Sequence, residues 1–167
     1  MAISTEAIRE LRERTGAGIM DVKRALEAAD GNADKAEVAL REKGLTKAAS
    51  KGDRSTAEGV VDAYIHGGGR IGALVELNCE TDFVARTPEF TELAHSLAMQ
   101  VAAMGAIYVA KEDMPADETR SAEEVCLLEQ PFIKESSKSI ADLIMDVRAR
   151  VGENIKVSRI TRFGLGE

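Results

Sequence analysis

Three consecutive glycines, Gly67 to Gly69, join two apolar and β-branched runs of the chain, residues 60–66 and 70–79. Glycine adopts positive φ values without steric cost, so a short glycine loop between two such runs predicts a β-hairpin with a three-residue loop. The hairpin requires an antiparallel sheet, and its apolar side chains require other elements to cover at least one face of that sheet.

The segment after the hairpin predicts a helix that covers the sheet. Thr87 and Pro88 have the order of an N-cap followed by proline at the first helical position. One face of this helix is apolar, with Phe90, Leu93, Ala94, Leu97, Ala98 and Val101. We also predict a short strand over residues 107–110, a last helix ending at Gly152 and a final strand over residues 155–163. The fold class is therefore α+β, a small antiparallel sheet packed with helices.

The first 45 residues predict three short helices instead of strands. Ser4 can cap the first helix, and the sequence Thr-Gly-Ala-Gly at residues 15–18 ends it. Apolar residues at helical spacing mark the second helix, and Asn32 can cap a third helix that is predicted to stop at Gly44. Helices this short are marginal in water, so they are expected to pack together as one module.

The charge pattern supports a division into two units. The whole chain has 167 residues and a net charge of −7, but residues 1–54 carry a net charge of +1 and residues 55–167 carry −8. We predict a three-helix module at residues 1–45, a linker at 46–58 and an α+β core domain at 59–167.

Composition argues against several classes of protein. The first ten residues lack the apolar core of a signal peptide, and polar residues interrupt the most apolar long stretch, residues 93–110. We therefore predict a cytoplasmic protein with no membrane partner. An acidic core without a basic stripe argues against direct binding of nucleic acid. Cys79 and Cys126 are 47 positions apart and have no second ligand pair nearby, so we interpret them as buried free thiols.

No group of residues predicts an enzyme, a cofactor site or a metal site. Neither His66 nor His95 has a serine or cysteine partner at local spacing. Glu76 and Glu80 would point to the same face of one strand, which is the weak basis for an acid and base pair. The three glycines lack the lysine of a phosphate-binding loop and lead into a strand.

The stretch NCETDFVAR, residues 78–86, follows the second strand and precedes the capped helix. In one interpretation Thr81 and Asp82 are turn residues, and Phe83 and Val84 fold back into the core. In the other, Phe83 is an exposed aromatic anchor beside a carboxylate, the kind of group that concentrates binding energy at an interface. Physical reasoning on these residues alone favours the first interpretation over the second.

Two long motifs resemble the signatures of the translation elongation factor Ts family. Residues 11–26, LRERTGAGIMDVKRAL, resemble its N-terminal signature, and residues 76–86, ELNCETDFVAR, resemble its second signature. Residues 127–132, LLEQPF, and 152–155, GENI, are similar to parts of its C-terminal half. The resemblance spans nearly the whole chain, and it corresponds to a short form of the family.

The resemblance implies a ubiquitin-associated-like fold for the three-helix module and guanine-nucleotide exchange on elongation factor Tu. In that family the aromatic residue of the Thr-Asp-Phe-Val motif inserts near the magnesium and phosphate site of the GTPase. Here the partner-binding residues would be Thr81, Asp82, Phe83 and Val84, together with the turn residues Ile19, Met20 and Asp21. Whether the chain also forms a homodimer is left open.

One departure from the family concerns a segment between Pro115 and Leu127. Longer members have an extended, largely helical segment here, whereas this chain has 11 residues. The alternative function is a non-catalytic adaptor whose three-helix module binds ubiquitin-like or peptide partners, in which the Thr-Asp-Phe-Val loop would have no role.

Overall fold

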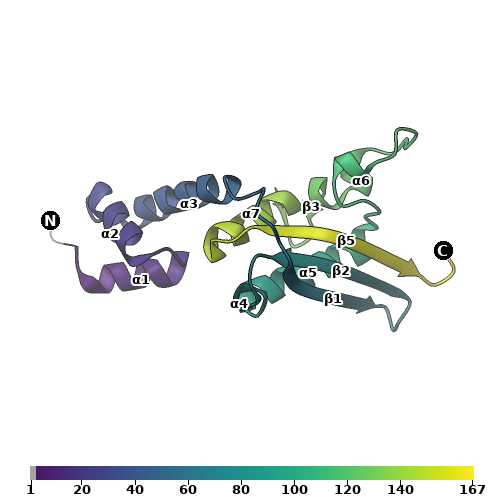
Figure 1. Cartoon of the computed structure of the whole chain (residues 1–167), viewed down its shortest axis with the longest axis horizontal. Coiled ribbons are helices and arrows are strands. Elements are labelled where there is room, and N and C mark those ends of the chain that lie inside the picture. Colours follow the sequence, from purple (N-terminus) through teal and green to yellow (C-terminus); the bar gives the residue numbers. More distant parts are fainter. Residues whose placement is uncertain (1–2) are drawn as a thin grey trace.

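A computed structural model describes residues 3–167 of the chain, and its fold is α+β, as predicted. Three helices come first: α1 (Thr5–Thr15), α2 (Ile19–Ala28) and α3 (Ala33–Ala49). A domain of sheet and helices follows. Figure 1 shows an elongated molecule, with the three-helix module at one end and the C-terminus at the other.

The predicted capping residues begin and end the helices of the module. The Ser4 side chain accepts a hydrogen bond from the Ala7 backbone N–H, and the Asn32 side chain accepts one from Lys35. Gly16 ends α1 in the left-handed conformation that glycine favours, with φ of 66°. The buried residues of the module form their own cluster: Leu11, Val22, Leu26, Ala36 and Leu40.

The prediction that the third helix stops at Gly44 is wrong, because α3 continues to Ala49. Its second half packs on α7 (Ile140–Val151), and a Cβ placed on Gly44 would lie 3.1 Å from the Cβ of Ala149. One turn earlier, Arg41 Nη2 donates to both carboxylate oxygens of Asp146, at 3.0 and 3.1 Å. The glycine therefore allows two helices to approach closely, and this packing offsets its weak helical preference.

The central sheet has three antiparallel strands in the order β1-β2-β5: β1 (Glu58–His66), β2 (Ile71–Cys79) and β5 (Ile155–Gly164). The predicted hairpin is present, but its loop has four residues because Arg70 lies outside β2. The Arg70 N–H closes the loop by donating to the His66 carbonyl at 3.1 Å. All three glycines of the loop have positive φ, between 61° and 87°. A bulge opposite Glu76 and Leu77 adds one residue to β5.

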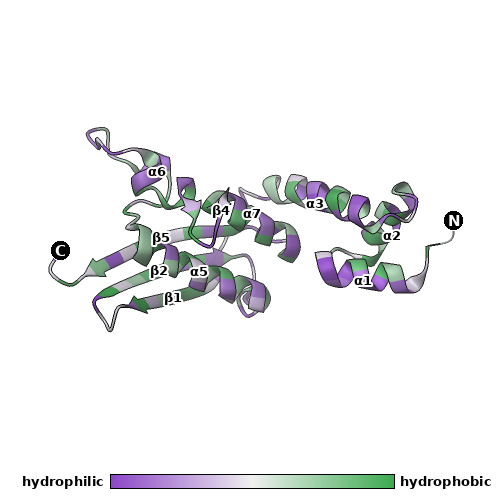
Figure 2. Ribbon diagram, turned by 180° about the vertical axis from the view of Figure 1, so that it is seen from behind, coloured by the Kyte–Doolittle hydropathy of each residue, from purple (hydrophilic) through white to green (hydrophobic). Residues whose placement is uncertain are grey.

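Helices α5 (Pro88–Met104) and α7 pack together, and α5 contacts all three strands of the sheet. Thr87 caps α5 by accepting from the Phe90 N–H, and Gly152 ends α7 in the left-handed conformation, both as predicted. Apolar residues from the strands and the two helices form the core. Figures 1 and 2 show the molecule from opposite sides, and Figure 2 shows apolar residues also along the strands toward the hairpin end. The second face of the sheet carries exposed Val61, Ile65, Leu74 and Phe163.

The region between α5 and α7 differs most from prediction. Residues 107–110 do not form the predicted strand, and only an isolated bridge joins Tyr108 to Cys126. This region instead contains the short helices η1 (Lys111–Asp113), α6 (Ala122–Val125) and η2 (Leu127–Glu129), and a small hairpin, β3 (Pro131–Phe132) and β4 (Glu135–Ser139). The hairpin was not predicted, because its second strand, ESSKS, has no apolar alternation.

The core of the sheet domain and the core of the module are separate clusters of buried residues. Helix α3 crosses the predicted boundary between the module and the linker. The division at residues 45 and 58 stays a prediction.

Candidate functional site

The short helix α4 (Asp82–Ala85) presents one aromatic side chain to solvent. Phe83 is 79% exposed, more than any other large apolar residue of the described chain. Its neighbours in the helix differ, since Ala85 is buried and Val84 packs against the core. Each interpretation therefore holds for part of the stretch. Val84 packs against the core, whereas Phe83 is exposed and available as an anchor for a partner.

Thr81 holds α4 in place through its backbone and its hydroxyl. The hydroxyl accepts from the Val84 N–H at 3.4 Å, which caps the helix, and the Thr81 carbonyl accepts from the Cys79 thiol at 3.1 Å. Thr81 and Val84 thus have partners inside the protein. Of the predicted motif, Asp82 and Phe83 are the two residues directed to solvent.

Asp82 forms a salt bridge with Arg86 at 2.9 Å, across one turn of helix. Both side chains remain exposed, at 44% for Asp82 and 78% for Arg86. An exposed pair of this kind contributes roughly 0–1 kcal/mol to stability and is easily exchanged for other partners. The carboxylate is therefore accessible beside the aromatic ring.

The second predicted contact lies at the start of α2. Ile19 and Met20 are 54% and 58% exposed in its first turn, which follows Gly18. Asp21 differs from them because Lys43 and Lys47 bind its carboxylate at 2.6 and 3.2 Å. These two lysines lower the pKa of Asp21, so its charge is already compensated inside the module. Ile19 and Met20 are the accessible apolar residues of this turn.

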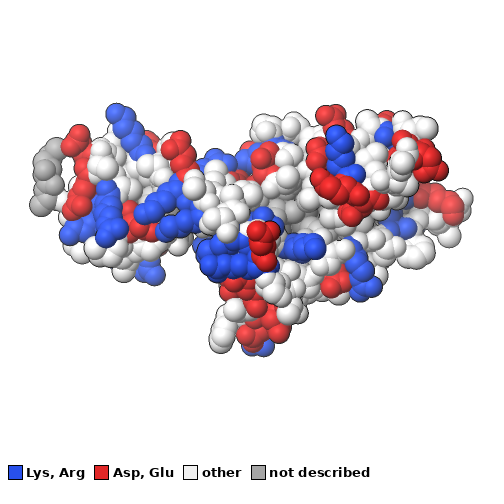
Figure 3. Space-filling view, turned by 45° about the horizontal axis from the view of Figure 1, so that its top comes forward, with Lys and Arg blue, Asp and Glu red and all other residues white. Residues whose placement is uncertain are grey.

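A cleft of about 370 Å³ with a largely basic lining lies between the turn before α2, helix α3 and the end of α7. The turn before α2 borders one side of it, and the end of α7 borders the other. Figure 3 shows basic side chains gathered near this junction. Several of them have partners in the protein: Arg14 pairs with Glu37, and Lys51 donates to the Gly152 carbonyl.

In Figure 1, α4 lies at the end of the core domain that faces the module. One predicted contact segment thus lies in the module, and the other lies on the side of the core domain nearest to the module. The glycine hairpin lies at the opposite end of the core domain.

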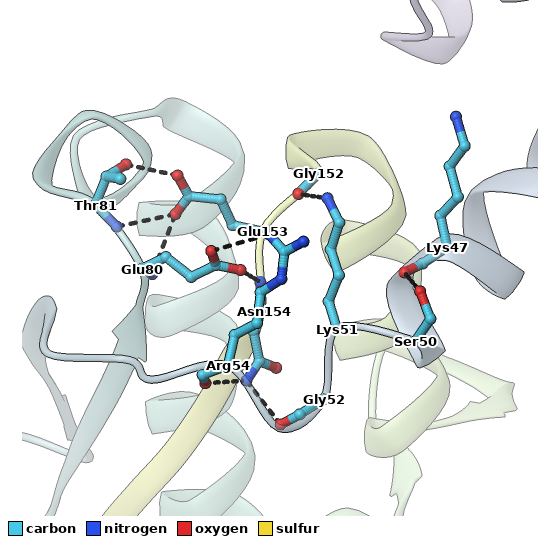
Figure 4. A network of polar contacts seen from close by, with 10 residues as sticks. All are labelled: Lys47, Ser50, Lys51, Gly52, Arg54, Glu80, Thr81, Gly152, Glu153 and Asn154. Carbon is cyan, nitrogen blue, oxygen red and sulfur yellow. Dashed lines mark hydrogen bonds and ion pairs between the residues drawn. The ribbon is translucent and has the colours of Figure 1, made fainter.

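The polar contacts in Figure 4 join the linker, the end of β2 and the turn after α7. Glu80 accepts from the Asn154 N–H at 2.7 Å and pairs with Arg54 at 3.4 Å. These contacts, the Asn154 N–H foremost, lower the pKa of Glu80. The carboxylate is therefore an ionised structural group. No local sequence pattern indicates this network, because its members lie up to 102 residues apart.

The weak candidates for acid and base chemistry do not form a catalytic pair. Glu76 lies on the open face of the sheet and binds Arg159 at 2.6 Å, whereas Glu80 belongs to the linker network. Neither glutamate lines the cleft between the module and the core domain. His95 approaches Asp62 at 3.4 Å, and His66 stacks on Tyr64.

Both cysteines are buried free thiols, as predicted. Burial raises the pKa of the Cys79 thiol to about 11, so it is protonated at neutral pH and a poor nucleophile. Among residues 3–167, no group of three or more histidine, cysteine or acidic residues is arranged to hold a metal ion. None of the helices described combines the length and the apolar character needed to cross a membrane.

Comparisons with known proteins agree with the resemblance of the motifs. A family model described as "Elongation factor TS" matches residues 35–122. An elongation factor Ts of Carboxydothermus hydrogenoformans is 49% identical over 195 aligned positions, which cover 99% of this chain and 90% of that protein. One of Thermotoga petrophila is 47% identical and covers 100% of this chain and 98% of that protein. One of Desulfitobacterium hafniense is 45% identical, with 99% and 90% covered.

The alignments run over 195 positions, whereas this chain has 167 residues. At least 28 aligned positions of these relatives therefore have no counterpart here. The chain is nevertheless similar to them over nearly its whole length.

Proposed function

The chain belongs to the elongation factor Ts family, and we propose how its surface acts on the GTPase. As a member of the family it is a nucleotide exchange factor for elongation factor Tu in translation elongation, and it forms no covalent bond with its partner. We propose that Phe83 is the wedge that enters the GTPase near its magnesium and phosphate site, with Asp82 contacting the same surface. The high exposure of Phe83 on a capped helix is the observation that carries this proposal.

The physical basis of exchange is the coupling between two binding equilibria. A factor that binds the nucleotide-free GTPase more tightly than the nucleotide-bound form must weaken nucleotide binding by the same factor. It accelerates nucleotide release and rebinding alike and leaves their overall equilibrium unchanged. Much of the affinity of a GTPase for nucleotide depends on the magnesium ion and on the groups around the phosphates, so a small displacement there is costly.

Phe83 suits this role because its position is fixed before binding. An aromatic ring has few rotatable bonds and buries a large area, so it loses little conformational entropy when a partner covers it. Helix α4 is anchored on either side, by the Thr81 cap and by Ala85 in the core. The ring is therefore exposed on a rigid support.

We propose that Ile19 and Met20 form a second contact with the same GTPase. Both are exposed apolar residues in the first turn of α2, and in Figure 1 α4 lies on the side of the core domain nearest to the module. Asp21 would act mainly by holding Lys43 and Lys47 beside this turn. Thr81 and Val84 would act through the shape of α4.

The test of this function measures release of fluorescent GDP from elongation factor Tu under excess unlabelled GDP. Substoichiometric amounts of the protein should accelerate release with multiple turnovers, because the factor is regenerated after each exchange. Absence of acceleration by folded protein would contradict the proposal. An adaptor of the alternative class would capture its partner regardless of added GDP and magnesium, whereas this protein should be displaced from the GTPase by both together.

We propose, in addition, that two copies associate through the open face of the sheet, which carries Val61, Ile65, Leu74 and Phe163. These side chains are exposed and apolar, and the charges beside them pair with one another, Glu76 with Arg159. An apolar face is complementary to a second copy of itself, and a two-fold axis would bring equivalent residues together.

The association can be measured by sedimentation equilibrium. The protein should be a dimer at micromolar concentration, and Phe163→Asp should make it a monomer because the charge would be buried without a partner. Val38→Asp, at an exposed apolar position on α3, is the matched control and should remain dimeric. A monomeric unmodified protein would refute this arrangement.

A further inference from the structure

The carboxylate of Glu153 lies at the base of the loop that carries Phe83. One of its oxygens accepts from the backbone N–H groups of Glu80 and Thr81, at 3.1 and 3.0 Å. The other accepts from the Thr81 hydroxyl at 2.6 Å. Figure 4 shows this carboxylate directed from the turn after α7 toward the end of β2. A carboxylate that binds two converging N–H groups and a hydroxyl forms charge-assisted hydrogen bonds.

These contacts reach Phe83 through Thr81. The Thr81 hydroxyl donates to Glu153 and accepts from the Val84 N–H, so the rotamer that caps α4 is the one that Glu153 binds. Helix α4 has four residues and cannot hold its own conformation in water. Its orientation therefore depends on the groups that fix its first turn.

The next residue, Asn154, binds the linker. Its side-chain Nδ2 donates to the carbonyls of Gly52 and Arg54, at 2.9 and 2.8 Å. Its backbone N–H binds Glu80, and Asn154 itself is buried. Adjacent residues of one turn thus hold the base of α4 and the segment that leads to the three-helix module.

We propose that Glu153 is a positioning residue for nucleotide exchange, which fixes α4 so that Phe83 and the module meet the GTPase together. This inference rests on the proposed role of Phe83. Glu153 itself would not contact the GTPase and would act through Thr81. Its effect on exchange should therefore require the Phe83 ring.

The experiment combines Glu153→Ala and Phe83→Ala in a double-mutant cycle, with the rate of GDP release per micromolar factor as the readout. Glu153→Ala alone should lower this rate about tenfold, because an aromatic anchor that is no longer held in position loses part of its contact with the GTPase. In the Phe83→Ala background it should lower the rate little further, since the ring that it positions is gone. If the alanine variant does not fold, Glu153→Gln, which keeps the side-chain volume, replaces it in the cycle.

Glu118 supplies a matched control. Its carboxylate also accepts from two backbone N–H groups, those of Thr119 and Arg120, and from a hydroxyl, that of Tyr108. It lies in the loop before α6, far along the chain from α4. Glu118→Gln should leave the rate of exchange unchanged.

Each result has one meaning. If the unmodified protein accelerates release and Glu153→Ala and Glu153→Gln do so equally well, the positioning role is wrong while the proposed function stands. If Glu153→Ala lowers the rate by the same factor with and without the Phe83 ring, Glu153 does not act through that ring, and the inference is again overturned. If the unmodified protein does not accelerate release, the proposed function itself fails.

Discussion

Replacing Phe83 with alanine should lower the rate of GDP release by on the order of 100-fold, the effect expected when an aromatic anchor is truncated at the centre of an interface. The free energy of unfolding should change by less than about 0.5 kcal/mol, because the ring is 79% exposed and contributes little to the core. Fluorescent GDP release and urea denaturation of the same preparation measure the two effects.

The two measurements separate an anchor from a core residue. A folded variant with unchanged exchange would refute the role of the ring as a wedge. A variant that unfolds would show that the ring stabilises the protein, which is the interpretation that its exposure argues against. Because the helix remains capped by Thr81, the variant should keep the local backbone and lose only the ring.

Phe90→Ala should have the opposite pattern. Phe90 lies seven residues after Phe83, in α5, and is completely buried beneath the sheet. Loss of its ring should lower the free energy of unfolding by roughly 3–5 kcal/mol, from lost transfer energy and from the cavity that remains. This is a large fraction of the 5–15 kcal/mol that typically stabilises a domain.

Urea denaturation, analysed by linear extrapolation, measures that loss. Exchange activity per folded molecule should stay near that of the unmodified protein, since Phe90 does not reach the partner surface. A loss of less than about 1 kcal/mol would contradict the packing described here, because full burial of phenylalanine predicts more. The two phenylalanines thus serve as controls for each other.

Local signals in the sequence predicted much of the fold. The three glycines, the Thr87 and Pro88 pair and the caps at Ser4 and Asn32 all act within a few residues, and each has the predicted role. The elements that differ depend on contacts between distant residues. Helix α3 continues past Gly44 because α7 packs against it, which no pattern near Gly44 indicates.

The small β3-β4 hairpin also depends on contacts between residues that lie far apart in the sequence. Gln100, buried in α5, donates to the Pro131 carbonyl and accepts from the Ile133 N–H, so one side chain satisfies the backbone of the turn. In the sequence Gln100 appears only as an interruption of an apolar stretch. Contacts across about 30 residues have no local signature.

In the candidate site, too, local motifs indicate some residues, and contacts between distant residues determine the others. The resemblance indicates the motif residues 81–84, whereas physical reasoning on the residues alone favours a core position for both Phe83 and Val84. The structure separates exposed Phe83 from Val84, which packs on the core. The contacts of Glu153 with Thr81 span 72 residues, so its position could not be inferred from spacing.

The close approach of α3 and α7 at Gly44 also affects avidity, the gain in affinity when two contacts bind one partner together. If the module hung on a flexible tether, binding at α4 would leave the module to search for its own contact, at an effective concentration that falls as the tether lengthens. Here α3 lies against the core domain, with Gly44 facing Ala149. If both proposed contacts reach the GTPase, they belong to one rigid bivalent ligand. The geometry of a helix crossing, rather than the length of a linker, then determines how strongly the second contact reinforces the first.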